Sequence, residues 1–289
     1  MLIDTHAHLN DKRYTQDGNS LDEIVAEISL QAIINVGTTE QNSRESLLLA
    51  NTYSKVFATV GIHPHYSKDV SKDYLKALKE MVESDLLSLS AKTDSKNSDA
   101  DSAKSGSKLA NFERRIVAIG ECGLDYYYDF SPRATQQKVF EEQIFLAYTL
   151  GLPLIVHTRD AAKDTLDILK ANKNYLAGRA EVGVMHCYSG SKEDAKKYLD
   201  LGFYISFAGP VTYPNYKKED VILAVPRDRL LIETDCPYLT PQAHRGKLNY
   251  PSYVKYVAEK IAEVKGLSFE CIANLTTSNA CRLFGLRKI

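Results

Sequence analysis

The stretch Leu2-Ile3-Asp4-Thr5-His6-Ala7-His8-Leu9 opens the chain with a short apolar run that leads directly into two histidines. Apolar runs of strand length recur along the sequence and alternate with amphipathic segments, a pattern typical of parallel strands joined by helices. Because about eight such strands close a barrel, we predict an α/β fold, a single (β/α)₈ TIM barrel over residues 1–289. The predicted strands are Leu2–Asp4, Ala32–Val36, Val56–Val60, Ile116–Ile119, Leu154–Val156, Val182–Met185, Phe203–Ser206 and Leu230–Ile232.

Helix signals lie between the predicted strands. Ser20 and Glu23 have the spacing of a capping box and precede an apolar stripe at helical spacing. Gly151 is placed to end a second helix, and Pro251 to begin a third. One segment, at about 88–111, breaks the alternation because it is rich in Ser, Lys, Asp and Ala. We predict a solvated low-complexity insertion there, with a partner-binding loop as the alternative.

The composition is that of a soluble globular protein, with 44% hydrophobic and 25% charged residues. No apolar run approaches the ~20 residues that cross a bilayer, and the first residues lack the pattern of a signal peptide. We therefore expect a cytoplasmic monomer with no membrane partner, and the five cysteines to be reduced thiols. The net charge of −1 argues against a long nucleic-acid track, because such binding is largely neutralisation of phosphates by Lys and Arg.

The placement of the histidines is the most informative feature of the sequence. Six of the seven histidines follow predicted strands, and Glu121 and Asp235 follow the fourth and eighth strands. The carboxyl ends of all barrel strands open onto one face, so these residues are expected to converge there. The histidines concerned are His6, His8, His63, His65, His157 and His186.

Imidazoles combined with carboxylates suit divalent zinc, manganese, nickel or iron, and with extra water magnesium. His6 and His8 point to the same side of an extended segment, since strand side chains alternate with period two. Four histidines and two carboxylates exceed the needs of one tetrahedral ion, so we predict two neighbouring divalent ions. Glu233 either orients a ligand or forms an interior ion pair.

At these residues the sequence resembles the TatD family of metal-dependent deoxyribonucleases, within the wider amidohydrolase-like barrels. The matching stretches follow the family's order over nearly the whole chain, and the segment at about 88–111 is the main departure. The stretches are Ile3–Leu9, Gly61–His65, Ile119–Tyr126, Pro153–Arg159, His186–Gly190, Glu233–Leu239 and Arg245–Lys247.

The resemblance implies a role for each candidate residue. His6, His8 and Asp235 would hold one metal ion, His157 and His186 the second, and Glu121 would bridge them. Asp235 would also be the base that deprotonates the attacking water. The catalytic set is completed by His63, which would donate a hydrogen bond to the phosphate or protonate the leaving group. The implied substrate is DNA, or RNA, cut at single-stranded or terminal nucleotides by a 3′–5′ exonuclease.

Three further residues are candidates for substrate contacts. Arg159 follows the fifth strand, where its guanidinium could donate hydrogen bonds to a phosphate oxygen or form a structural salt bridge. Arg245, in the loop after the eighth strand, could supply local positive charge. Tyr126 begins a run of three tyrosines that could stack on an unpaired base or simply pack. His65 is expected to pack beside Pro64 rather than to take part in the chemistry.

Two other functions fit the same residues. A two-metal amidohydrolase or esterase, such as an aminoacyl-ester hydrolase, would activate water in the same way. Many such barrels bridge their metals with a carboxylated lysine, whereas Glu121 occupies the fourth-strand position here. A catalytically inactive scaffold would carry at least one broken ligand position, and none is broken in this sequence.

Overall fold

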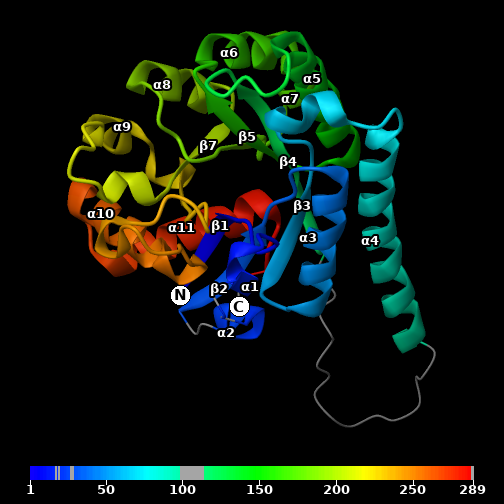
Figure 1. The fold of residues 1–289 in the computed structure, drawn as a ribbon, viewed down its shortest axis with the longest axis horizontal. Helices are drawn as coiled ribbons and strands as arrows, with labels where there is room; N and C mark the ends of the chain where they lie inside the picture. Colours follow the sequence, from blue (N-terminus) through cyan, green and yellow to red (C-terminus); the bar gives the residue numbers. More distant parts are fainter. Residues whose placement is uncertain (17, 19, 27–28, 98–113, 288–289) are drawn as a thin grey trace.

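The computed structural model describes the chain except for residues 17, 19, 27–28, 98–113 and 288–289. One parallel sheet of eight strands lies at its centre, and neighbouring strands follow sequence order (Figure 1). Backbone hydrogen bonds close the ring, because Asp235 N donates to His6 O at 2.9 Å and His8 N to Cys236 O at 2.8 Å. The predicted TIM barrel is confirmed. The strands are β1 (Leu2–Ala7), β2 (Leu30–Asn35), β3 (Val56–Val60), β4 (Ile116–Asp125), β5 (Leu154–Arg159), β6 (Gly183–Met185), β7 (Phe203–Phe207) and β8 (Leu230–Ile232).

Helices join the strands and surround the barrel (Figure 1). Among the residues described, no helix has the length and apolar character needed to cross a membrane. The α-helices are α1 (Arg13–Gln16), α2 (Leu21–Val25), α3 (Glu40–Thr52), α4 (Tyr74–Asn97), α5 (Arg133–Leu150), α6 (Ala162–Ala171), α7 (Lys173–Leu176), α8 (Lys192–Asp200), α9 (Glu219–Ala224), α10 (Val254–Lys265) and α11 (Phe269–Phe284). The 3₁₀ helices are η1 (Pro64–Asp69), η2 (Gly209–Thr212), η3 (Arg227–Arg229), η4 (Gln242–His244) and η5 (Pro251–Tyr253).

The local signals act as the sequence predicts. Ser20 Oγ accepts a hydrogen bond from Glu23 N at 3.2 Å, and Glu23 accepts one from Ser20 N, which completes the capping box of α2. Gly151 follows α5 with a φ of 64°, the left-handed conformation that suits glycine at a helix end. Pro251 begins η5, which leads directly into α10.

Two hydrophobic clusters separate the inside of the barrel from the outside. One cluster consists almost entirely of residues from the eight strands, together with the end of α11 and no other helix, so it fills the inside of the barrel. The last part of α11 closes this interior with Ala280, Leu283 and Phe284. The alternate strand residues pack against the surrounding helices. The inward residues include Ile3, Ile34, Phe57, Val117, Ile155, Val184, Tyr204 and Leu231.

The structure corrects the predicted bounds of several segments. β1, β4 and β5 extend beyond their predicted ends, because each continues through the polar residues that follow its apolar run. The segment at about 88–111 is not an insertion throughout, because α4 runs on to Asn97. The Ala, Lys and Leu in this part of the segment are strong helix formers. Residues 98–113 lie outside the described part of the chain.

Candidate metal centre

Three of the predicted ligands lie at the carboxyl ends of β5, β6 and β8. His157 lies two residues after the inward-facing Ile155, and His186 two residues after the inward-facing Val184, so strand alternation points both toward the axis. Asp235 lies three residues beyond the end of β8 with a left-handed φ of 57°, so alternation alone does not set its direction. The carboxyl end of the sheet is where the loops of a TIM barrel assemble its active site.

His6 and Glu121 depend on irregularities in their strands. The register of β1 against β2 shifts within residues 4–7, and that of β4 against β5 shifts within residues 119–122. Each shift therefore occurs where the predicted ligand lies. A β-bulge re-aims a side chain in this way, and here the shifts bring both side chains among the other ligands.

One group of four side-chain atoms, the first donor set, gathers around the end of β1. His6 Nε2 lies 3.2 Å from His8 Nε2. Asp235 Oδ1 lies 3.7 Å from His6 Nε2 and 3.4 Å from His8 Nε2. Glu121 Oε2 completes the set at 3.4 Å from His6 Nε2.

A second donor set gathers around the other oxygen of the same glutamate. Glu121 Oε1 lies 3.0 Å from His157 Nδ1 and 2.8 Å from His186 Nε2. The two ring nitrogens are 3.1 Å apart. The rings of His6 and His186 stack at 4.1 Å, so the two sets are adjacent. Glu121 is the one residue that serves both sets, with one oxygen in each.

The donor sets fit divalent cations. Metal–ligand bonds of about 2.0–2.2 Å place neighbouring donors about 3.0–3.5 Å apart, close to the separations found here. Burial alone would raise the pKa of Glu121, but the surrounding rings of His186, His63 and His6 lower it well below its usual value. Burial also lowers the pKa of His6, which favours the neutral ring that a metal requires. The six side chains lie together as the sequence predicts, and their assignment as metal ligands stays a prediction.

Carboxylates behind the rings orient the second donor set. Asp125 Oδ2 lies 3.1 Å from His157 Nε2, and Glu233 Oε1 lies 3.3 Å from His186 Nδ1. Such acids fix the tautomer and the direction of a ligating ring. Of the two roles predicted for Glu233, the geometry matches the orienting one. Asp125 was missed in the sequence, although it follows Glu121 at an even spacing along β4.

His63 and His65 form a pair beside the second donor set. His65 N donates to His63 Nδ1 at 3.1 Å, which places the proton of a neutral His63 on Nε2. This Nε2 lies 3.5 Å from Glu121 Oε1, and burial lowers the His63 pKa well below its ordinary value. The expectation that His65 only packs beside Pro64 is wrong, because His65 Nε2 lies 2.9 Å from Asp125 Oδ2.

A buried acid connects β1 to the residues that follow β8, behind the first donor set. Asp4 is fully buried. Its Oδ1 accepts hydrogen bonds from Thr234 N at 2.9 Å and His6 N at 3.3 Å. Its Oδ2 pairs with the Thr234 hydroxyl at 2.5 Å. Burial raises the pKa of Asp4 to about 8. These bonds hold the backbones of His6 and of the residue before Asp235 together.

Two of the predicted substrate contacts lie near β4 and β5. The Arg159 guanidinium lies over the ring of Tyr127 at 3.9 Å and over that of Tyr128 at 4.7 Å. The Tyr126 hydroxyl instead donates to Asp164 at 2.9 Å, and Arg133 covers its ring at 4.3 Å. Tyr126 is therefore held by its neighbours, whereas the two tyrosines after it are exposed.

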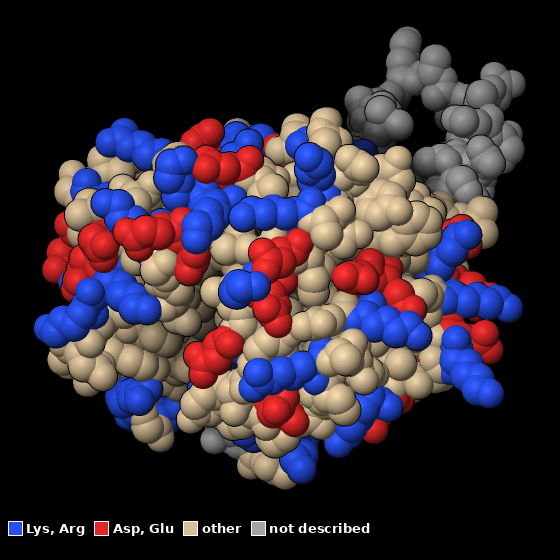
Figure 2. Space-filling view, turned by 90° about the horizontal axis from the view of Figure 1, so that it is seen from above, with Lys and Arg blue, Asp and Glu red and all other residues tan. Residues whose placement is uncertain are grey.

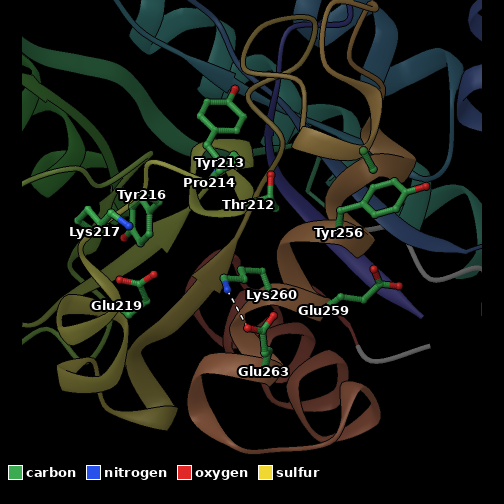
Figure 3. A pocket seen from close by; sticks show the side chains of 11 residues that line it. Thr212, Tyr213, Pro214, Tyr216, Lys217, Glu219, Tyr256, Glu259, Lys260 and Glu263 are labelled. Carbon is green, nitrogen blue, oxygen red and sulfur yellow. Dashed lines mark hydrogen bonds and ion pairs between the residues drawn. The ribbon is translucent and has the colours of Figure 1, made fainter.

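The third predicted contact, Arg245, lies against an aromatic ring that follows β7. Its guanidinium stacks 4.1 Å above the ring of Tyr213. Tyr213 lines a cleft of about 400 Å³ between the loop after β7 and α10, shown in Figure 3. Lys260 in this cleft is ion-paired with Glu263 at 2.9 Å, and no member of either donor set lines it. Figure 2 shows Lys and Arg interspersed with Asp and Glu across the face in view, in keeping with the low net charge.

Comparison with known proteins places this arrangement in a family. The family model described as TatD-related DNase matches residues 3–285. The chain belongs to the TatD-related DNase family. It is 42% identical over 285 residues to the metal-dependent hydrolase YabD of Bacillus subtilis, covering 98% of this chain and 99% of YabD. The suggested resemblance is thus confirmed, and the chain is a TatD-family metal-dependent hydrolase.

Two further relatives extend the comparison. The TatD homologue YjjV of Escherichia coli K12 has a solved structure with a TM-score of 0.81 and 28% identity, covering 99% of this chain and 98% of YjjV. The 3′-5′ ssDNA/RNA exonuclease TatD of Rahnella sp. is 29% identical over 292 residues, covering 99% of this chain and 98% of that relative. The TatD-family likeness therefore spans the whole barrel.

Proposed function

We propose that this TatD-family chain is a phosphodiesterase that uses two divalent metal ions to remove nucleotides from the 3′ end of single-stranded DNA. The observation that carries the proposal is the position of Glu121, whose two oxygens each face a different group of imidazole nitrogens. The relative named as a 3′-5′ ssDNA/RNA exonuclease supports the choice of substrate, and makes RNA the second substrate to test.

The two donor sets divide the proposed ligands between the ions. His6, His8 and Asp235 would hold one ion, His157 and His186 the other, with Glu121 common to both. Divalent ions bound there would polarise the phosphate and lower the pKa of water, which is the chemistry that phosphodiester hydrolysis requires. Magnesium, manganese, zinc and nickel all accept such ligands.

The protein's own side chains would then move protons and hold the phosphate. The pKa of Asp235 is lowered, because the contacts with His8 and His6 outweigh the effect of burial. Asp235 therefore stays a carboxylate that can accept a proton from the attacking water. His63 accepts from His65 N through Nδ1, and its Nε2 lies 3.5 Å from Glu121 Oε1; this Nε2 would donate to a phosphate oxygen or to the leaving oxygen. Within the described part of the chain, no carboxylate is ion-paired with Arg159, which leaves its N–H groups for a phosphate.

The low net charge favours action at a chain end. A long duplex track would need many phosphate contacts and usually a basic surface. With a net charge of −1 and interspersed surface charges, we infer short contacts around one terminal linkage.

The test is hydrolysis of 5′-labelled single-stranded DNA, single-stranded RNA and duplex DNA with Mg²⁺, Mn²⁺, Zn²⁺ or Ni²⁺. We expect a ladder that shortens one nucleotide at a time from the 3′ end of single-stranded DNA, and loss of activity with a chelator. Intact nucleic acid with every metal, together with cleavage of cyclic amides or aminoacyl esters by the same preparation, would replace the proposal with the amidohydrolase or esterase alternative.

A further inference from the structure

Three exposed aromatic side chains lie together on the loop after β4, beside the second donor set. Tyr127, Tyr128 and Phe130 expose 58%, 47% and 55% of their surfaces. The rings of Tyr128 and Phe130 stack at 5.2 Å with an interplanar angle of 19°. We call these three residues the aromatic shelf. Large exposed apolar side chains that gather in one place mark a binding surface more often than isolated ones do.

Hydrogen bonds connect the aromatic shelf to the metal centre. Asp125 Oδ1 accepts from the backbone N–H groups of Tyr127 and Tyr128, each at 3.0 Å. The other oxygen of Asp125 contacts the His157 ring and the His65 ring. His65 in turn packs edge-on against the shelf, at 5.4 Å from Tyr128 and 4.9 Å from Phe130. One buried carboxylate thus sets both the direction of a proposed ligand and the position of the shelf.

A cation completes the surface. The Arg159 guanidinium lies over the rings of Tyr127 and Tyr128. When an arginine stacks on an aromatic ring, its N–H groups point outward in the plane of the guanidinium and stay available for a phosphate. The shelf therefore presents apolar rings and a phosphate donor next to each other, which are the two chemical features of a nucleotide.

We propose that the aromatic shelf binds an unpaired nucleobase of the substrate next to the cleaved phosphate, with Arg159 on a neighbouring phosphate. This inference rests on the proposed nuclease function and adds the determinant of its preference for single strands. A base inside a duplex has both faces covered by its neighbours, whereas an unpaired base can turn a free face to the shelf. Stacking of this kind tolerates any base sequence, because every base has an aromatic face.

Helix α5 supplies matched controls. Phe145 and Tyr148 on α5 are also exposed, at 52% and 49%, and they contact another tyrosine, Tyr175. No donor-set residue is among their ring contacts within the described part of the chain. Substitutions there change an exposed aromatic residue without touching the shelf.

The binding test uses the absence of tryptophan from the sequence. Tyr127→Trp places a single indole on the shelf, and Tyr148→Trp places one on α5. Metal-loaded protein is titrated with a phosphorothioate oligothymidylate, which resists hydrolysis. We expect saturable quenching of Tyr127→Trp and little change in Tyr148→Trp. Equal quenching of both variants, or no quenching of Tyr127→Trp at an oligonucleotide concentration that saturates the protein, would overturn the proposal.

The kinetic test pairs protein and substrate changes. Tyr128→Ala should raise KM for single-stranded DNA about tenfold, with the loss disappearing on substrates that lack the contacted base. Abasic residues at each of the last three positions identify that base, and Phe145→Ala is the control. Normal kinetics of Tyr127→Ala, Tyr128→Ala and Phe130→Ala would reject the shelf while leaving the nuclease function intact. A wild-type protein that cleaves no nucleic acid rejects the nuclease function, and the quenching experiment still decides the shelf.

Discussion

The two donor sets of the metal centre are held in different ways. Behind the second set, Asp125 and Glu233 contact the outer nitrogens of His157 and His186. In the first set, His6 Nδ1 is buried and has no hydrogen-bond partner among the residues described. The first set depends on the backbone instead. The hydrogen bonds that close the barrel hold it in place, together with the hydrogen bonds from Asp4 to Thr234, which we call the Asp4 clamp.

This difference shows that separate parts of one fold can position two neighbouring metal sites. Outer carboxylates tune and orient the second set, so single side-chain changes should loosen it alone. The first set is built into the junction of β1 and the residues after β8, so its geometry is a property of barrel closure. Glu121 belongs to both sets, so its substitution should weaken the binding of both ions.

The largest loss of activity is expected at Glu121, the residue that the two donor sets share. Glu121→Gln removes the negative charge that the two donor sets share and replaces one of its two oxygens by an NH₂ group, so both ions should bind weakly and hydrolysis of single-stranded DNA should fall by at least about 10³-fold. Metal content by mass spectrometry and initial rates measure the two losses. Glu142→Gln, which changes a carboxylate bonded to Tyr74, is the control. A variant that keeps full metal content and loses less than tenfold in rate would contradict the shared role.

Asp235→Asn should separate binding from chemistry within the first set. An amide oxygen can still face His6 and His8, so most of the metal should remain. The amide cannot accept the proton of water, and the rate should fall by about 10²–10⁴-fold. Metal content and single-turnover rates, measured on the same sample, give the two values. Near-normal turnover would remove Asp235 from the mechanism.

The outer carboxylates offer the sharpest test of the comparison. Glu233→Gln and Asp125→Asn should each weaken binding of one ion by about 10–100-fold and leave the other nearly unchanged. Calorimetric titration of Mn²⁺ into metal-free protein resolves the two events. Asp164→Asn alters a carboxylate that contacts Tyr126 outside both donor sets, and should change neither. Equal weakening of both ions would mean that the sets are not independently supported.

The smallest effect is expected on folding stability, at the Asp4 clamp behind the first donor set. Burial raises the pKa of Asp4 from its ordinary value of 3.8 to about 8, so between these pH values folding must add a proton to this group. Wild type should therefore lose stability relative to Asp4→Asn as pH rises from 5 to 8, by about 1–3 kcal/mol. Thermal unfolding in a chelating buffer measures the difference as a few degrees in Tm. A difference that stays constant with pH would show that Asp4 is ionised in the folded chain.

The sequence was sufficient to predict the barrel and the convergence of the six proposed ligands. Strand alternation carries His157 and His186 inward, whereas Asp235 lies beyond the end of β8 in a left-handed conformation that alternation does not predict. The register shifts at His6 and Glu121 leave no local signal, because pairing with a neighbouring strand produces them. The pairing of β4 with β5 also explains why residue 123 is a glycine, because a Cβ there would lie 2.0 Å from His157 O.

Side-chain partners far apart in sequence were harder to predict. His65 was assigned to packing because its partner, Asp125, lies 60 residues away. Among three consecutive tyrosines, only the fold distinguishes Tyr126, bonded to Asp164, from the two that face solvent. The helical end of α4 was missed because its polar composition is shared by helices and loops.

Anomalous diffraction from crystals grown with Mn²⁺ would test the central claim most directly. We predict two peaks on opposite sides of the Glu121 carboxylate, one among His6, His8 and Asp235 and the other between His157 and His186. One peak alone at saturating Mn²⁺, or two peaks away from Glu121, would contradict the account.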